Sequence, residues 1–145
     1  MYQSAKYYLQ TILSLEKRYG TVRSVDVARE LNYSKASVSR GMTLLRNQKC
    51  IFADENGFLQ FTEDGRKIAE NIYEKYQILT NFFMFYGKVD RKKAEVDACK
   101  VEHIISQETY EGIKRCLENN IDVIDKISWI RLLKKQEEQC IIALG

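Results

Sequence analysis

Three side chains that suit a metal ion stand close together in the second half of this 145-residue sequence. Cys99, Glu102 and His103 are spaced at i, i+3 and i+4, so a helix would present all three on one face. A thiolate, a carboxylate and an imidazole together suit Mn²⁺, Fe²⁺, Co²⁺ or Zn²⁺, and the thiolate favours the softer metals. Glu95, one turn before Cys99, could add a second carboxylate. The alternative is structural: the thiol packs, and the Glu102 and His103 side chains bond neighbours in the core.

A second chemically informative group consists of small polar and long basic side chains between residues 34 and 49. Small residues let a helix backbone approach DNA closely, and long donors reach base edges and phosphates. We expect Arg40 to contact a base, because its guanidinium can bind guanine O6 and N7 together. The candidate DNA-binding residues are Ser34, Lys35, Ser37, Ser39, Arg40, Arg46 and Lys49. The alternatives are a solvated helix face, or a domain of this shape that binds protein.

Charge and composition narrow the class of protein. The net charge is only +3, but residues 33–53 contain four basic residues and no acidic one. Such a local basic surface suits a phosphate backbone. With 45% hydrophobic and 30% charged residues, the chain has the balance of a soluble globular protein. No apolar run approaches the ~20 residues of a membrane span, and the start lacks a signal region, so we expect a cytoplasmic protein.

The elements that must position the basic group can be predicted from local patterns. A helix over 7–19 ends at Gly20, and Ser24 is expected to cap a short helix with Val25, Ala28 and Leu31 facing inward. Asn32-Tyr33 form a turn, and Ser34 caps a helix to about residue 48 that buries Val38, Met42 and Leu45. The segments 50–53 and 58–61 are β-prone, and Asn56-Gly57 between them is a strong hairpin signal. The order predicts a winged helix-turn-helix over residues 24–62.

The remainder is predicted to be entirely helical. We expect helices over 63–86, ended by Gly87, over 90–105, opened by Asp90, over 106–119, capped by Ser106, and over 122–140. The fold class is therefore mainly α with a small β wing, with domains at 1–62 for DNA binding and 63–145 for dimerisation and metal sensing. The aromatic segment 81–86 is interpreted as dimer core, the alternative being an effector pocket, and the region around Trp129 as packing or an interface helix. At the wing tip, Asp54 and Glu55 are expected to repel phosphates.

The order of these motifs resembles the iron-dependent repressor and manganese transport regulator family, of the diphtheria-toxin-repressor type. The stretches that carry the resemblance are 8–12, 25–31, 34–40, 59–66 and 97–106, and it extends from about residue 4 to 119. It implies a homodimer that binds a palindromic operator on double-stranded DNA, responds to Mn²⁺ or Fe²⁺, and represses metal-uptake genes. The family's optional SH3-like domain is not expected in a chain of this length.

The sequence departs from the family at several expected metal ligands. Tyr7 and Gln10 stand where the family has a Met or Asp and often a Glu, Tyr76 replaces a His, and Thr80 occupies another ligand position. A phenol and an amide are weak ligands at neutral pH. We therefore expect an altered or degenerate metal site; the alternatives are a metal-independent regulator that senses another ligand, and a protein-interaction module without DNA affinity. An enzyme is not expected, because the chain has one histidine and no nucleophile motif.

Overall fold

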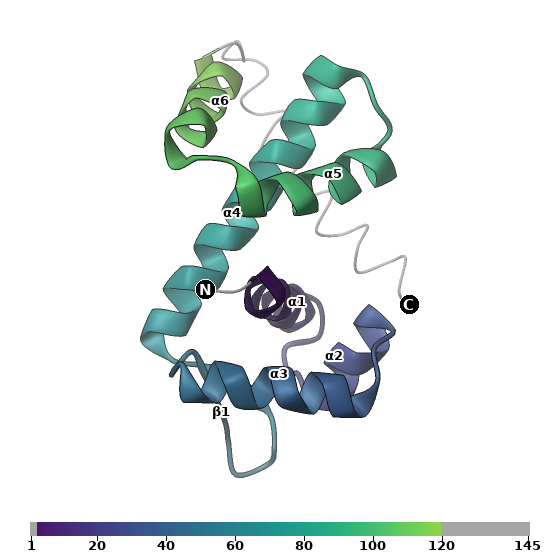
Figure 1. The fold of residues 1–145 in the computed structure, drawn as a ribbon, viewed down its shortest axis with the longest axis vertical. Coiled ribbons are helices and arrows are strands. Elements are labelled where there is room, and N and C mark those ends of the chain that lie inside the picture. The colour runs from purple at the N-terminus through teal and green to yellow at the C-terminus, as the bar shows by residue number, and fades with distance from the viewer. Residues whose placement is uncertain (1–2, 120–145) are drawn as a thin grey trace. The chain divides into compact units, whose positions relative to one another are not determined.

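The computed structural model describes residues 3–119 and divides them into two compact units, one up to Glu74 and one from Lys75. Helix α4 runs through both units (Figure 1). The elements in chain order are α1 (Gln3–Tyr19), α2 (Ser24–Leu31), α3 (Lys35–Asn47), β1 (Ile51–Ala53), β2 (Leu59–Phe61), α4 (Glu63–Gly87), α5 (Arg91–Ile104) and α6 (Gln107–Asn119). The predicted fold class, mainly α with a small β wing, is confirmed.

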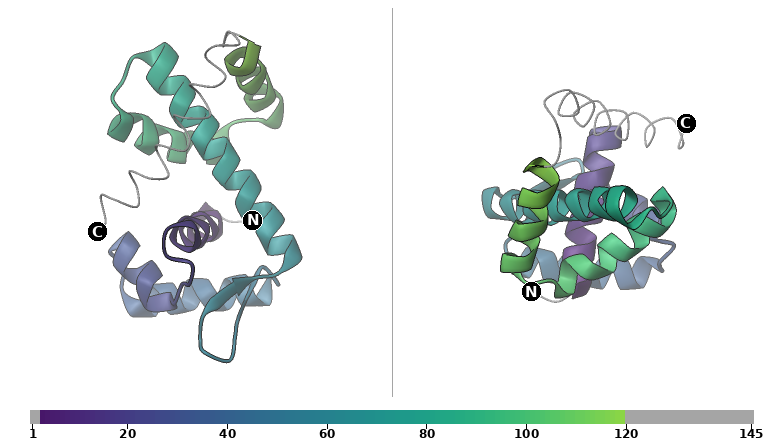
Figure 2. Two further views of the ribbon diagram at one scale, coloured as in Figure 1. Left: turned by 180° about the vertical axis from the view of Figure 1, so that it is seen from behind. Right: turned by 90° about the horizontal axis from the view of Figure 1, so that it is seen from above.

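The N-terminal unit is built around α1, which packs against both α2 and α3. Leu9, Ile12 and Leu13 of α1 are almost fully buried, together with Met42 and Leu45 of α3. In Figures 1 and 2, α1 lies on one side of α3 and the hairpin on the other, so α3 is left with an outward face next to the hairpin.

The short helix α2 begins differently from the prediction. Arg23, not Ser24, is the N-cap residue, and its backbone N–H donates to Asp26 Oδ2 at 2.8 Å. Val25 was expected to face inward but is exposed, and Val27 is buried in its place. Two residues along an α-helix differ by about 200° around the axis, so burying Val27 turns Val25 to solvent. The first helix is also longer than predicted and begins at Gln3.

Helix α3 follows the prediction closely. Asn32 ends α2 in the left-handed conformation, with φ 54°, which makes the tight turn between the helices. The Ser34 hydroxyl then accepts the backbone N–H of Ser37 at 3.1 Å and caps α3. Val38, Met42 and Leu45 are buried as expected.

The predicted hairpin is confirmed, and we call residues 51–61 the wing. Strand β1 pairs with β2 in antiparallel fashion, with Ile51 opposite Phe61 and Ala53 opposite Leu59. Gly57 has a φ of +81°, which an L side chain rarely adopts and glycine adopts freely. The backbone N–H of Leu59 donates to the carbonyl of Val22 at 2.7 Å, so the α1–α2 connection runs beside β2.

The C-terminal unit contains the end of α4 with α5 and α6. Asp90 caps α5 by accepting the Lys93 N–H at 2.9 Å, and Ser106 caps α6 by accepting the Thr109 N–H at 3.2 Å, both as predicted. Gly87 was expected to break α4 but is its last residue, and the left-handed residue that turns the chain is Lys88, with φ 54°.

The helix predicted over 122–140 and Trp129 within it lie outside the described residues. The predicted domain boundary at 62 and 63 coincides with the start of α4, whereas the two compact units meet inside that helix; the domain assignment stays a prediction. Among residues 3–119, no helix is both long enough and apolar enough to cross a membrane.

Candidate nucleic-acid interface and metal centre

The outward face of α3 and the residues that flank its two ends carry the predicted DNA-binding residues. Ser37 is half-buried, and all the others are exposed. The exposed members are Ser34, Lys35, Ser39, Arg40, Arg46 and Lys49. Among the ion pairs of the described residues, none engages Lys35, Arg40, Arg46 or Lys49. The face is therefore basic, rich in small residues and open to a ligand.

Ser37 organises the beginning of this face. The Ser34 hydroxyl donates to Ser37 Oγ at 2.9 Å, and Arg40 Nη2 donates to the same oxygen at 3.3 Å. The guanidinium of Arg40 is thereby drawn toward the N-terminal end of α3, where the free N–H groups of a helix attract anions. Ser37 thus acts within the protein as the anchor of Arg40, a role that its exposure pattern alone would not indicate.

Tyr8 of α1 is a residue of this region that the sequence did not single out as functional. Its side chain is buried, its hydroxyl donates to the Ser37 carbonyl at 3.4 Å, and its ring meets that of Tyr33 edge-on, with centroids 6.3 Å apart. Burial raises the pKa of the Tyr8 phenol above its ordinary value, so it stays a neutral donor. Gly41 leaves room for this ring. A glycine in the middle of a predicted helix was the sequence signal that could have indicated a closely packed side chain there.

The two acids of the wing have different surroundings. Asp54 Oδ1 accepts the N–H groups of Asn56 and Phe58 at 2.9 and 3.0 Å, and Oδ2 accepts the Gln60 amide at 3.1 Å. These bonds, the one from Gln60 first, hold the pKa of Asp54 below its ordinary value. Asp54 was expected to repel phosphates from the tip, but its carboxylate is directed into the hairpin. Glu55 is the acid that is exposed there.

In the C-terminal unit, α5 brings two of the predicted metal ligands together. His103 Nδ1 lies 2.9 Å from Glu102 Oε2, and the two side chains are only 4% and 1% exposed. Cys99 lies one turn earlier on the same helix and is half-buried. Across residues 3–119, no three His, Cys, Asp or Glu side chains are gathered closely enough to hold a metal. The structure thus pairs Glu102 with His103 and does not add Cys99 or Glu95 to them.

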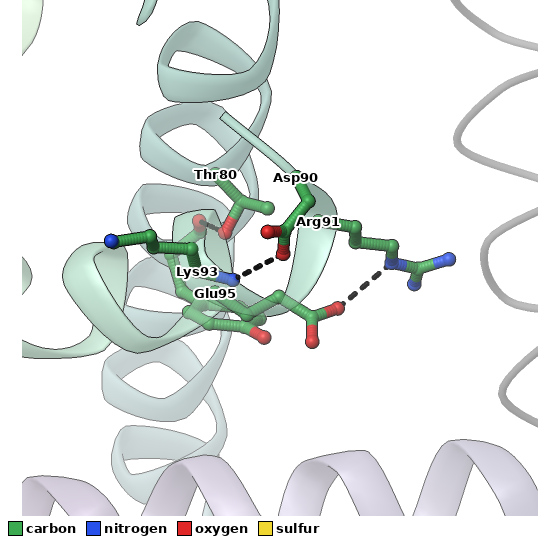
Figure 3. Close-up of polar contacts among 6 residues, drawn as sticks. Thr80, Asp90, Arg91, Lys93 and Glu95 are labelled. Atoms are coloured by element: carbon green, nitrogen blue, oxygen red, sulfur yellow. Dashed lines mark hydrogen bonds and ion pairs between the residues drawn. The ribbon is translucent and has the colours of Figure 1, made fainter. Parts of the chain in front are cut away.

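Glu95 and most of the positions where the family has metal ligands make hydrogen bonds within the protein. Figure 3 shows Glu95 Oε1 accepting a bond from Arg91 Nε, at 2.9 Å. Thr80 Oγ1 donates to the Tyr76 carbonyl at 2.8 Å. On α1, the carbonyl of Tyr7 accepts the Thr11 hydroxyl at 2.9 Å. Gln10 Oε1 is buried and accepts no hydrogen bond from the described residues.

Comparison with known proteins identifies the kind of protein to which this architecture belongs. Residues 62–120 match the model of the iron dependent repressor, metal binding and dimerisation domain. The transcriptional regulator MntR of Escherichia coli is 30% identical over 107 residues, which cover 74% of this chain and 68% of that protein. The chain belongs to the family of MntR and the diphtheria toxin repressor. The resemblance predicted from the sequence is therefore confirmed.

Two further comparisons concern proteins that are less similar in sequence. The diphtheria toxin repressor of Corynebacterium diphtheriae is 25% identical over 112 residues, covering 77% of this chain and 50% of that protein. The structure of the manganese regulator SloR matches 83% of this chain with a TM-score of 0.73 at 21% identity. The chain spans about half the length of these two relatives, since it covers 56% of the SloR chain.

The family's metal-binding domain raises the question of whether these residues fit a divalent metal. A buried carboxylate beside a buried imidazole is a suitable pair of ligands. Zinc sites take three or four protein donors, and no group of three such donors occurs among the described residues. The donor set fits part of a coordination shell, with the Cys99 thiol on the same helix as the nearest candidate for a third ligand.

Proposed function

We propose that the protein is a dimeric, DNA-binding transcriptional regulator that represses metal-homeostasis genes and carries an altered site for Mn²⁺ or Fe²⁺. The observation that carries the DNA-binding part is the outward face of α3. It combines small residues at the start of the helix with basic side chains that make no ion pair among the described residues, and Ser37 Oγ accepts a bond from Arg40 Nη2. A recognition helix of a helix-turn-helix contacts bases with its N-terminal residues.

Family membership and exposed apolar surface support the homodimer. The matched family model is described as a dimerisation domain. In the C-terminal unit, Phe85, Tyr86, Val96 and Ile104 are between 47% and 81% exposed. Large apolar side chains left in water favour burial against another subunit. Two identical reading helices would fit a palindromic operator, with half-sites one or more helical turns apart.

The pair Glu102–His103 supports a role in metal sensing, with Cys99 completing the protein donors. A bound divalent metal would supply a local positive charge that this buried carboxylate can balance. Thr80 and Tyr76 support the loss of a second site, because a phenol is a weak ligand at neutral pH and the Thr80 hydroxyl bonds the helix backbone. The metal site is altered in that it keeps one group of ligands and lacks the second.

The DNA-binding part is tested with Arg40→Ala. The probe is a duplex selected by the wild-type protein from a random library, and binding is measured by fluorescence anisotropy. Because a bidentate arginine–guanine contact contributes about 1–3 kcal/mol, Arg40→Ala should weaken binding to the selected duplex by that amount and lose preference at one position. Lys67→Ala is the control, since Lys67 is exposed on α4 and pairs only with Glu63. Equal affinities for the two variants would remove Arg40 as a base contact.

The metal part is tested by titrating Mn²⁺, Fe²⁺, Co²⁺ and Zn²⁺ into the same binding assay. We expect Cys99→Ser to weaken the metal response, and Cys116→Ser, a half-buried cysteine of α6, to leave it unchanged. His103→Ala should abolish the response while the duplex is still bound, and a melting curve shows whether that variant is folded. A wild-type protein without response to any of these metals would favour the second candidate, a metal-independent regulator.

That second candidate rests on a specific observation. The Glu102 and His103 side chains already lie at ion-pair distance from each other, and Arg91 supplies a protein cation to Glu95. A carboxylate that already has a partner within the protein has less to gain from a metal ion. The unresponsive wild type described above, together with sequence-specific DNA binding, is the result expected for it.

A further inference from the structure

Arg23 lies on the wing although the sequence places it in the connection between α1 and α2. Its guanidinium carbon is 4.3 Å from the centre of the Phe58 ring, a cation–π distance. The bond from the Leu59 N–H to the Val22 carbonyl fixes the preceding residue against β2. Two contacts therefore hold the start of α2 and the second half of the wing together, and they carry a positive charge onto the hairpin.

The donors of this guanidinium are available to a ligand. Arg23 is exposed, and within the described part of the chain no carboxylate lies within ion-pair distance of its side chain. The nearby Asp54 uses both carboxylate oxygens on Asn56, Phe58 and Gln60. A guanidinium stacked on a ring keeps its edge free, and that edge matches the oxygens of a phosphate.

Arg23 also lies where a DNA duplex bound to α3 would approach the protein. The wing and the outward face of α3 lie on the same side of the N-terminal unit (Figure 1). A duplex whose major groove receives α3 presents its sugar–phosphate backbone to the elements that flank this helix. The flanking wing has one exposed acid, Glu55, at its tip, and Arg23 is placed over Phe58, the residue between the turn and β2.

We infer that Arg23, held on the wing by Phe58, contacts a phosphate of the DNA backbone. The inference rests on the proposed DNA-binding function and assigns the wing an attractive role there. The positive charge of Arg23 comes from outside the hairpin, so it cannot be predicted from the sequence of the wing, whose tip is acidic. The contact is independent of base sequence, since a phosphate carries no base identity.

The test measures affinity for the selected duplex, and for a duplex of scrambled sequence, between about 50 and 200 mM salt. Arg23→Ala should weaken binding to both duplexes about fivefold to tenfold and reduce the slope of log K against log salt by about 1. Arg23→Lys should keep the slope, because it keeps the charge, while losing part of the affinity. Lys67→Ala removes an equal charge from α4 and should change neither quantity.

The outcomes separate this inference from the proposed function. If Arg40→Ala weakens specific binding while Arg23→Ala behaves as Lys67→Ala does, the Arg23 inference is wrong and DNA binding stands. If the loss in Arg23→Ala is confined to A·T-rich duplexes with an unchanged salt slope, Arg23 reads the minor groove and the phosphate assignment is wrong. If the wild type binds neither duplex, both the proposed DNA-binding function and the Arg23 inference are wrong. Melting curves of the variants establish that each is folded.

Discussion

Gly65 offers the sharpest test of how the wing is attached to the rest of the N-terminal unit. It lies in the first turn of α4, where this helix touches the backbone of Cys50. A methyl group added at Gly65 would lie 2.6 Å from the carbonyl carbon of Cys50 and 2.8 Å from its Cα, and closer still to its oxygen. Real Cβ atoms essentially never come within 3.0 Å of such atoms, and the obstacle is backbone, not a flexible side chain.

The expected cost of Gly65→Ala follows from these contacts. The helix start must retreat by about 1 Å in a tightly packed region, which costs about 1–3 kcal/mol. The retreat also strains the bonds from the Thr62 N–H to the Cys50 carbonyl, 3.0 Å, and from the Thr62 hydroxyl to the Lys49 carbonyl, 2.6 Å. At about 1 kcal/mol for each bond, the free energy of unfolding should fall by about 3–5 kcal/mol in total.

Thermal and urea denaturation followed by circular dichroism measure this change. A loss of this size should lower the melting temperature by about 10–20 °C in a chain of this length. Gly112→Ala in α6 is the matched control, because the nearest atom to its added methyl is 3.8 Å away. That control should be stabilised by up to about 1 kcal/mol, since alanine favours a helix interior. A Gly65→Ala protein as stable as wild type would refute the close approach of α4 to Cys50.

Three further changes follow from the same reasoning. Gly41→Ala should destabilise the protein by about 1–3 kcal/mol, because its methyl would lie 2.8 Å from Cδ2 of the buried Tyr8 ring, and a second change, Tyr8→Leu, should recover part of the loss in urea titrations. Asp90→Ala removes the cap of α5 and should cost about 1 kcal/mol, whereas the exposed Asp97→Ala should stay within about 0.5 kcal/mol of wild type. The pKa of Asp54 lies below its ordinary value, so the ionised carboxylate stabilises the protein above the ordinary pKa, and this effect is lost as pH falls through the lowered pKa. Melting temperatures between about pH 5 and 2 should therefore decline less steeply in Asp54→Asn than in wild type. Equal declines would contradict the stabilising role of the Asp54 carboxylate.

Local signals in the sequence determined much of the fold. Ser34, Asp90 and Ser106 each cap the helix that the sequence predicted, since a cap needs only a side chain and an N–H three residues away. Asn56-Gly57 marked the hairpin because a left-handed residue is a local requirement. Even the misplaced cap of α2 moved by a single residue, from Ser24 to Arg23.

The sequence also identified the candidate metal ligands, but it could not show which of their side chains contact each other. The spacing of Cys99, Glu102 and His103 places them on one helix, yet side-chain packing decides which of them meet. The structure joins Glu102 to His103, and within residues 3–119 it gathers no three such donors closely enough to hold a metal. Likewise, the basic residues of α3 are readable from their spacing, whereas the anchoring of Arg40 by Ser37 depends on rotamers.

Contacts between distant segments were decided only by the tertiary structure. Arg66 bonds both oxygens of Glu16 across 50 residues, the Tyr8 ring fills the space above Gly41, and the Arg23 side chain stacks on Phe58. No periodicity predicts such pairs, because each depends on how the helices pack and on the direction in which the chain turns between them. The sequence alone therefore determined a basic helix beside a hairpin, and only the folded unit decided that the hairpin carries a positive charge from a residue outside it.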